Sequence, residues 1–283
     1  MSSILIVGYG KIGEPLAKRL VDRGHSVTGL RRESPAGVDS IVTLISADIT
    51  RVESMAGVPK YFDQLFIILP PSERSESGYR KIYQTGLTNL LHHFSGSQNR
   101  PHAFFVSSTS VYAQNRGQIV DEQSITEPVN YNGRCLLSAE QSVFQYRADS
   151  VVVRFSGIYG RGRGSIEQRT KRVREVQYHP PCFSNRIHQD DCVSVLEFLF
   201  QQRIKGMALE NIYIASDTDG ATQWDSMTWL ANQTGCPPPT PITSDSDINQ
   251  NKRCSSQRLI SLGYQFKYPT FREGYTAELA GLN

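Results

Sequence analysis

The opening of the chain constrains its fold more than any other stretch. An apolar run, Ser3–Val7, leads into a G-x-G-x-x-G turn made by Gly8, Gly10 and Gly13. In a strand-turn-helix unit the first glycine permits the tight turn, the second lets the backbone approach a pyrophosphate, and the third lets the helix pack on the strand. The helix N-terminus then favours the anion, because its amide groups and its dipole point toward it.

The residues after this turn have the pattern that such a unit requires. A helical apolar stripe follows, Gly24 ends it, and a second apolar run occupies His25–Leu30. A plain strand-to-helix turn would use the same glycines, but the strand-turn-helix-strand order favours a dinucleotide-binding unit. The turn residues predicted to bind the cofactor are Gly8, Tyr9, Gly10, Lys11, Ile12 and Gly13.

The end of the second strand bears on the choice of cofactor. In NAD-binding folds an acidic residue here accepts hydrogen bonds from the adenosine ribose, whereas arginine accommodates the 2′-phosphate of NADP. This chain has Arg31 and Arg32 at that place. Guanidinium groups donate two parallel charge-assisted bonds to a phosphate. We therefore predict NADP in preference to NAD; the alternative is a solvated basic corner whose arginines point away.

Two further apolar runs, Ile41–Ser46 and Gln64–Leu69, are typical of buried parallel strands. Ligands of open α/β sheets bind outside the carboxyl ends of the strands, so the residues that end or follow these runs should line the cofactor crevice. They are Asp48, Ile49, Leu69 and Pro70. Asp48 could accept a hydrogen bond from the adenine amino group, or it could simply form a turn.

Composition excludes several classes of protein. The 283 residues are 39% hydrophobic and 20% charged, which is ordinary globular usage. The net charge of +3 is too small to indicate a nucleic-acid partner, and no apolar run is long enough to span a membrane. The five scattered cysteines predict neither a disulfide framework nor a metal site. With no signal-peptide pattern at the start, we expect a cytoplasmic protein.

A fifth predicted strand begins at His102 and ends in four hydroxyl residues, Ser107–Ser110, before Val111-Tyr112. This run resembles the extended short-chain dehydrogenase/reductases, the NAD-dependent epimerase/dehydratase family, whose Ser-Ser-x-x-Val-Tyr-Gly pattern carries a catalytic Ser or Thr. On that pattern Ser108 corresponds to the catalytic hydroxyl, and Ala113 replaces the usual glycine. Further matches follow in the family's order along nearly the whole chain: Asp121-Glu122, Pro128, Arg154, Gly157–Gly160, Arg186–Asp191 and Leu262–Tyr264.

The resemblance breaks at the family's Tyr-x-x-x-Lys pair, in which Tyr is the general acid/base and Lys lowers the Tyr pKa. Aligning Ala139-Glu140 on the family pattern puts Asn132 at the Tyr position and Leu136 at the Lys position. Sliding by one residue recovers Tyr131 but puts Cys135 in place of the lysine. Together with Tyr83, where extended members commonly have Asn, and the shorter glycine turn, this resembles the atypical members of the superfamily.

The remaining candidates for chemistry are few. Ser108 and Tyr131 are the predicted catalytic residues, and Ser110 could also touch a substrate carbonyl; the alternative is a hydroxyl run that only caps loops. Arginines beside Gly160–Gly164, including Arg161 and Arg163, would suit an anionic substrate or form a solvated basic face. His188 is a further candidate for substrate contact, with a structural histidine as the alternative.

We therefore predict an α/β fold, a doubly wound parallel Rossmann sheet with a smaller C-terminal substrate lobe. The NAD(P)-binding domain should cover residues 1–155 and be rejoined by about 186–216, and the lobe should cover about 156–185 and 217–283. The leading function is an NADP-dependent oxidoreductase or epimerase acting on a carbonyl or nucleotide-sugar-like small molecule. The alternative is a non-catalytic NADP-binding sensor or scaffold. Extended relatives often pair through two helices, which makes a homodimer an option.

Overall fold

The computed structural model describes residues 1–33, 41–71, 73–96, 100–161, 166–243 and 250–281. The chain divides into two compact units. Unit 1 comprises Met1–Val111, Thr126–Arg154 and Val193–Tyr213, and unit 2 comprises Tyr112–Ile125, Phe155–Cys192 and Ile214–Asn283.

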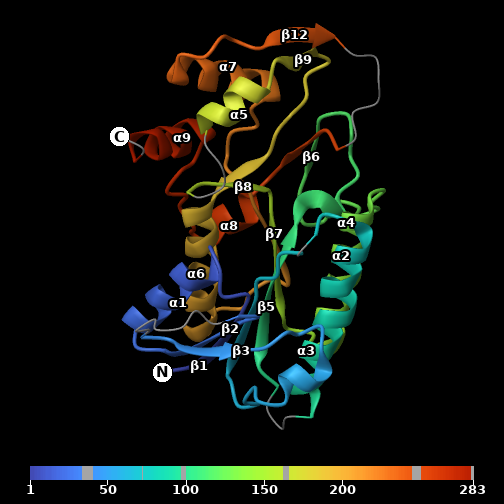
Figure 1. Ribbon diagram of the computed structural model, residues 1–283, viewed down its shortest axis with the longest axis vertical. Helices are drawn as coiled ribbons and strands as arrows, with labels where there is room; N and C mark the ends of the chain where they lie inside the picture. Colours follow the sequence, from blue (N-terminus) through green and yellow to red (C-terminus); the bar gives the residue numbers. More distant parts are fainter. Residues whose placement is uncertain (34–40, 72, 97–99, 162–165, 244–249, 282–283) are drawn as a thin grey trace. The chain divides into compact units, whose positions relative to one another are not determined.

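Unit 1 is organised by a seven-stranded parallel sheet in the order β11-β7-β5-β4-β1-β2-β3. Figure 1 shows α1 and α6 on one side of these strands and α2, α3 and α4 on the other. The predicted doubly wound α/β fold is thus confirmed. The strands are β1 (Ser3–Val7), β2 (Ser26–Arg31), β3 (Thr43–Ser46), β4 (Gln64–Ile67), β5 (His102–Ser108), β7 (Val151–Phe155) and β11 (Ile212–Ala215).

The helices of this part carry apolar faces that cover the sheet. Their bounds are α1 (Gly13–Asp22), η1 (Val52–Met55), α2 (Glu76–Arg80), η2 (Lys81–Gly86), α3 (Leu87–Ser95), η3 (Thr109–Val111), α4 (Tyr131–Tyr146) and α6 (Gln189–Ile204). The inner strands are fully buried, as Ile4–Val7 and Leu65–Ile67 illustrate. Such continuous burial explains why these strands are apolar runs in the sequence rather than alternating patterns.

The helical segment between β4 and β5 has an internal irregularity. It consists of α2, the π-helical turn η2 and α3 in succession. A Cβ at Gly86, the last residue of η2, would lie 2.9 Å from the Ile49 side chain. Apolar periodicity does not reveal a π-turn, because one extra residue in a turn leaves most of the stripe intact.

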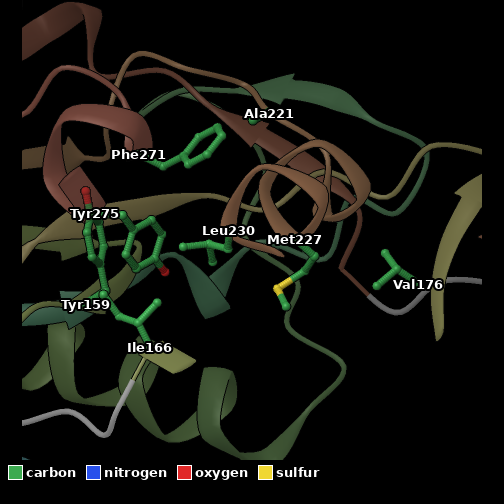
Figure 2. Close-up of a cluster of buried hydrophobic side chains, with 8 residues drawn as sticks. All are labelled: Tyr159, Ile166, Val176, Ala221, Met227, Leu230, Phe271 and Tyr275. Carbon is green, nitrogen blue, oxygen red and sulfur yellow. The ribbon is translucent and has the colours of Figure 1, made fainter. Parts of the chain in front are cut away.

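Unit 2 has short parallel strand pairs and its own core. The pairs are β6 (Gln118–Val120) with β13 (Lys252–Cys254), β8 (Gly157–Tyr159) with β10 (Arg186–His188), and β9 (Glu175–His179) with β12 (Thr240–Thr243). Its helices are α5 (Ile166–Arg172), α7 (Gln223–Thr234), α8 (Gln257–Ser261) and α9 (Phe271–Ala280). Figure 2 shows its core cluster of Tyr159, Ile166, Val176, Ala221, Met227, Leu230, Phe271 and Tyr275.

The observed division differs from the predicted domain boundaries in several segments. Residues 112–125, 155, 186–192 and 214–216 group with unit 2 instead of the Rossmann domain. The first segment contains β6, whose partner β13 is more than 100 residues away in sequence, and the Lys252 ammonium donates a hydrogen bond to the Tyr112 carbonyl (3.1 Å). Local sequence patterns do not reveal pairings across such separations. Within the described residues, no helix has the length and hydropathy needed to cross a membrane.

Candidate functional site

The glycine turn in unit 1 has the geometry that a close-approaching ligand requires. Gly8 has φ +99°, and a Cβ there would lie 1.9 Å from the Ile68 carbonyl oxygen. A Cβ at Gly13 would lie 2.4 Å from the Gly8 oxygen, so the helix start can pack on the strand only without a side chain. At Gly10, by contrast, a Cβ would meet nothing within 4 Å. Gly8 therefore permits the turn, Gly13 permits close packing of the helix on the strand, and Gly10 leaves the backbone open to a ligand, as the motif predicts.

Helix α1 begins directly after this turn without a side-chain cap at Ile12. Two backbone bonds shape the turn: the Gly10 amide donates to the Gly8 carbonyl (2.9 Å), and the Glu14 amide donates to the Gly10 carbonyl (2.8 Å). A helix N-terminus is an electropositive site that suits a phosphate. Lys11, Ile12 and Gly13 belong to this segment, and their contact with a cofactor stays a prediction.

A pocket of about 740 Å³ opens at the carboxyl ends of β1, β2, β3 and β4. It brings together most of the predicted cofactor-binding residues, namely Gly8, Tyr9, Gly10, Arg31, Arg32, Asp48, Ile49, Leu69 and Pro70. Sequence reasoning did not identify the other lining residues, which are Val7, Leu30, Glu33, Ser46, Ala47, Arg51, Ser54 and Ile82. The pocket combines apolar side chains, a glycine turn and arginines, and these residues fit a dinucleotide.

Tyr9 stands between the glycine turn and β2. Tyr9 is 8% exposed, and a Cβ at Gly29 would lie 2.4 Å from the Tyr9 Cδ2 atom. Because Gly29 has no side chain, the Tyr9 ring can pack against β2 where it lines the pocket. The place of Tyr9 within the motif predicts a cofactor contact, but the matching glycine on the neighbouring strand becomes evident only in the structure.

The pairing of β2 with β3 explains which residues lie beside Arg31 and Arg32 at one end of the pocket. Arg31 at the end of β2 pairs with Ser46 at the end of β3, and the Ser46 hydroxyl donates to the Arg32 carbonyl (2.7 Å). The next turn, beginning at Asp48, therefore lies beside Arg31 and Arg32 at the same edge of the sheet. The Arg31 and Arg32 side chains form no hydrogen bond or ion pair with any residue that the structure describes.

Asp48 forms a turn and lines the pocket at the same time. Its Oδ1 accepts hydrogen bonds from the Thr50 amide (2.9 Å) and the Thr50 hydroxyl (2.8 Å). Burial raises the pKa of Asp48, but these hydrogen bonds and the charges of Lys81 and Arg32 outweigh it, so the pKa lies below its ordinary value. The turn-forming alternative is thus observed, and an additional bond to adenine stays a prediction.

The hydroxyl run at the end of β5 is held close to helix α4. The Ser108 Oγ accepts a hydrogen bond from the Ser110 amide (3.2 Å), which leaves the Ser108 proton available for donation. A Cβ at Gly133 in the first turn of α4 would lie 2.4 Å from the Ser110 carbonyl oxygen. The glycine therefore permits a close approach between the first turn of α4 and the backbone of the hydroxyl run.

The family's catalytic pair is replaced in α4 by residues of different chemistry. Leu136 is 4% exposed, and Cys135, the alternative occupant of the lysine position, is also buried. A thiol carries no positive charge, and burial raises the pKa of Cys135, which disfavours its thiolate. The Tyr131 hydroxyl donates to the Arg74 carbonyl (2.8 Å), and its ring packs edge-on against Tyr79 at 5.5 Å.

A buried polar group supports this part of the sheet. The Glu140 carboxylate accepts hydrogen bonds from the Ser107 hydroxyl (2.6 Å) and from two guanidinium nitrogens of Arg154 (3.0 and 2.6 Å). All three residues are at most 4% exposed. The contacts join β5, α4 and β7, and so hold the strand that carries Ser108 against the helix that carries Tyr131.

The other predicted substrate residues belong to unit 2. Arg161 is exposed, whereas Arg163 lies outside the described residues. His188 is 2% exposed; its Nδ1 accepts a hydrogen bond from the Asp190 amide (3.1 Å), and its Nε2 lies 2.9 Å from the Glu278 carboxylate. These contacts account for both ring nitrogens and match the structural alternative for His188, while a substrate contact stays a prediction. Among the described residues, no cluster of His, Cys, Asp or Glu could hold a metal ion.

Comparisons with known proteins agree with this geometry. A profile of the NAD dependent epimerase/dehydratase family matches residues 4–202. The chain is 27% identical to protein YeeZ of Escherichia coli K12 over 95% of its own length and 97% of that protein. A solved structure from Methylobacillus flagellatus, described as of the NAD-dependent epimerase/dehydratase type, is 34% identical with a TM-score of 0.82, covering 99% of this chain and 98% of that chain.

More distant structures share the fold. UDP-glucuronic acid 4-epimerase from Bacillus cereus, solved in complex with NAD, is 18% identical with a TM-score of 0.75. The match covers 97% of this chain and 96% of that chain.

Proposed function

The chain belongs to the NAD dependent epimerase/dehydratase family, and on this premise we propose that it binds NADP and acts as an oxidoreductase or epimerase on a small or nucleotide-linked carbonyl compound. The observation that carries the proposal is the pocket in which the open glycine turn and the basic end of β2 meet. A dinucleotide bound to such a fold places its pyrophosphate at the glycine turn and its adenosine at the end of the second strand.

The preference for NADP over NAD rests on charge at the adenosine end. Arg31 and Arg32 line the pocket where NAD-binding folds place a carboxylate for the ribose hydroxyls. Glu33 also lines it, but two guanidinium groups precede it at the end of β2. A 2′-phosphate would offset this charge through charge-assisted hydrogen bonds. The epimerase from Bacillus cereus that binds NAD supports the dinucleotide class but not the choice between the two cofactors.

The chemistry proposed for the chain uses hydroxyl groups. A bound nicotinamide would accept or supply the hydride. The Ser108 hydroxyl, whose oxygen already accepts from the Ser110 amide, would donate a hydrogen bond to the substrate oxygen. Tyr131 would exchange a proton with that oxygen only after releasing the Arg74 carbonyl. In the register that uses Tyr131, the lysine position holds Cys135, a buried thiol without positive charge that cannot assist Tyr131 by charge, so we expect slow turnover.

The substrate class is proposed from the family and from charge. Solved relatives of this fold include UDP-sugar epimerases, whose substrates carry a diphosphate. Arg161 is exposed in unit 2 and is proposed to contact such an anionic group. A nucleotide sugar or another anionic carbonyl compound is therefore the substrate class to screen first.

The residues of helix α4 also favour a second function. Both registers of the catalytic pair lack an amine, and the Tyr131 hydroxyl is already engaged with a main-chain carbonyl. These features support a protein that binds NADP without turnover and acts as a sensor or scaffold. The two proposals share the cofactor and differ in whether a carbonyl substrate is reduced or epimerised.

The first test is a titration of the purified chain with NADPH and NADH, followed by nicotinamide fluorescence and thermal shift. We expect tighter binding of NADPH, and we expect the Arg31→Ala/Arg32→Ala variant to lose that preference by about ten-fold or more, since hydrogen bonds to charged groups contribute about 1.5–3 kcal/mol each. Binding of neither nucleotide would overturn both functions. If NADPH binds, turnover of carbonyl substrates that Ser108→Ala abolishes favours the enzyme, and binding without turnover favours the sensor.

A further inference from the structure

The pocket contains a third arginine that the glycine motif and the second strand do not predict. Arg51 lines the same pocket as Arg31 and Arg32, on the turn that follows β3. Because β3 pairs in parallel with β2, the residues after both strands meet at one edge of the sheet. Arg51 thus approaches the adenosine end of the pocket from the side opposite the glycine turn.

The backbone of Arg51 is well held. Its amide donates to the Asp48 carbonyl (3.0 Å), and its carbonyl accepts from the Ser54 amide (3.1 Å). The Ser54 hydroxyl in turn accepts a hydrogen bond from the Asp48 amide (2.8 Å). This closed turn fixes the point from which the Arg51 side chain leaves the backbone, and both Asp48 and Ser54 line the pocket.

The side chain of Arg51, in contrast, is held only by a weak, solvent-exposed ion pair. Its Nε donates to the Glu53 carboxylate (2.9 Å), and the two side chains are 66% and 68% exposed. Exposed ion pairs of this kind contribute about 0–1 kcal/mol, so a phosphate could compete for the guanidinium. Its terminal nitrogens bond to none of the residues that the structure describes, and they form the planar fork that binds a phosphate with two parallel bonds.

We propose that Arg51 is a specificity-determining residue that binds the adenosine 2′-phosphate together with Arg31 and Arg32. The proposal rests on the proposed cofactor function and adds a residue to it. The ion pair with Glu53 engages only the Arg51 Nε, so it does not occupy the two terminal nitrogens that would bind the phosphate. Arg31 at the end of β2 and Arg32 directly after it then form one side of the phosphate site, and Arg51 forms the other.

The chain offers a matched control at Arg80. Arg80 also donates through its Nε to a nearby glutamate, Glu76 (3.0 Å), is similarly exposed and lies in unit 1, but it does not line the pocket. Arg51→Ala and Arg80→Ala therefore remove the same charge from the same unit. Both side chains are exposed, so neither variant should change the unfolding temperature appreciably.

The experiment measures dissociation constants by calorimetry for wild type, Arg51→Ala, Arg51→Lys and Arg80→Ala. The probes are NADPH, NADH, adenosine 2′,5′-bisphosphate and ADP. We expect Arg51→Ala to weaken NADPH and the bisphosphate by about ten-fold, to leave NADH and ADP unchanged, and Arg51→Lys to recover part of the loss. Arg80→Ala should leave all four dissociation constants at their wild-type values.

The outcomes separate this inference from the proposed function. If wild type binds none of the probes, or prefers NADH, the proposed cofactor is wrong and the inference falls with it. If wild type prefers NADPH but Arg51→Ala retains its affinity, or loses NADPH and NADH affinity equally, the cofactor stands and the role of Arg51 is overturned. An equal loss in Arg80→Ala would overturn the role as well, because it would reveal a general effect of charge.

Discussion

At the scale of single residues, Asp217 shows how burial alters an acid. Its carboxyl group is 5% exposed, and its Oδ1 has no hydrogen-bond partner among the described residues. Burial raises the pKa of Asp217 to about 8, against the lowering effect of the Arg186 guanidinium and with reinforcement from Asp219. An unfolded aspartate titrates near pH 4 (about 3.9). Between these values the folded chain holds a proton that the unfolded chain releases.

This difference predicts a pH dependence of stability. The free energy of unfolding should fall as pH rises from about 4 to about 8, because the native state binds more protons there. Asp217→Asn is neutral at every pH, so we expect it to flatten this dependence and to unfold at a higher temperature than wild type near pH 8. Calorimetric unfolding temperatures from about pH 5 to about pH 9 measure the effect. Asp22→Asn, at an exposed site in α1, is the control; parallel curves for wild type and Asp217→Asn would contradict the prediction.

At the scale of secondary-structure elements, the buried Glu140 joins three of them. It accepts from Ser107 in β5 and Arg154 in β7, while itself belonging to α4. The family resemblance indicated Glu140 and Arg154 separately, since both match positions of the family pattern, but their pairing and the contribution of Ser107 come from the packing of helix on sheet. The hydrogen bond from Ser107 links β5, which carries Ser108, to α4, which carries Tyr131, and the ion pair links α4 to β7.

Breaking the Glu140–Arg154 ion pair should strongly lower the free energy of unfolding. Glu140→Gln leaves the Arg154 charge buried and uncompensated, and such changes destabilise by about 3–5 kcal/mol. Ser107→Ala removes only one hydrogen bond, for which we expect about 1 kcal/mol. Denaturation in urea measures both free energies of unfolding. The double variant Glu140→Gln/Arg154→Met should recover part of the loss, because it removes the unpaired charge; a loss below about 1 kcal/mol for Glu140→Gln would contradict the assignment.

At the scale of the whole molecule, helix α4 has a face suited to contact with a second copy of the chain. Leu137 and Phe144 are seven residues apart, so they lie on one side of the helix, and both remain partly exposed in the single chain. Extended relatives of the resembled family often pair through this helix and the one preceding β5. We therefore predict that the chain forms a homodimer through this face.

Light scattering after size exclusion tests it. We expect a mass twice the 31.7 kDa of the chain for wild type, and the mass of one chain for Phe144→Glu, because a charge would have to be buried in the interface. Ser138→Glu, at an exposed position of the same helix but about 100° round the axis from Leu137, should stay dimeric if Phe144 is the contact. A monomeric wild type, or a dimeric Phe144→Glu, would exclude this interface.

How much the sequence reveals depends on how local the cause is. The glycine turn, the apolar strands and the basic end of β2 depend on residues adjacent in the chain, and each is visible as a pattern. The loss of the family's Tyr-x-x-x-Lys pair is equally a local fact, since Asn132 and Leu136, or Tyr131 and Cys135, can be aligned without coordinates. These patterns established the α/β fold and the family.

Tertiary structure alone decided which distant residues meet. It brought Arg51 to the pocket of Arg31 and Arg32, set the Tyr9 ring against Gly29, and grouped residues 112–125 with unit 2 through β6 and β13. Strand pairing and helix packing depend on the free energy of burying many side chains together, and no short window of sequence contains that sum. The sequence by itself therefore determined the α/β scaffold and its glycine turn, and the packing of the chain decided which side chains complete the pocket.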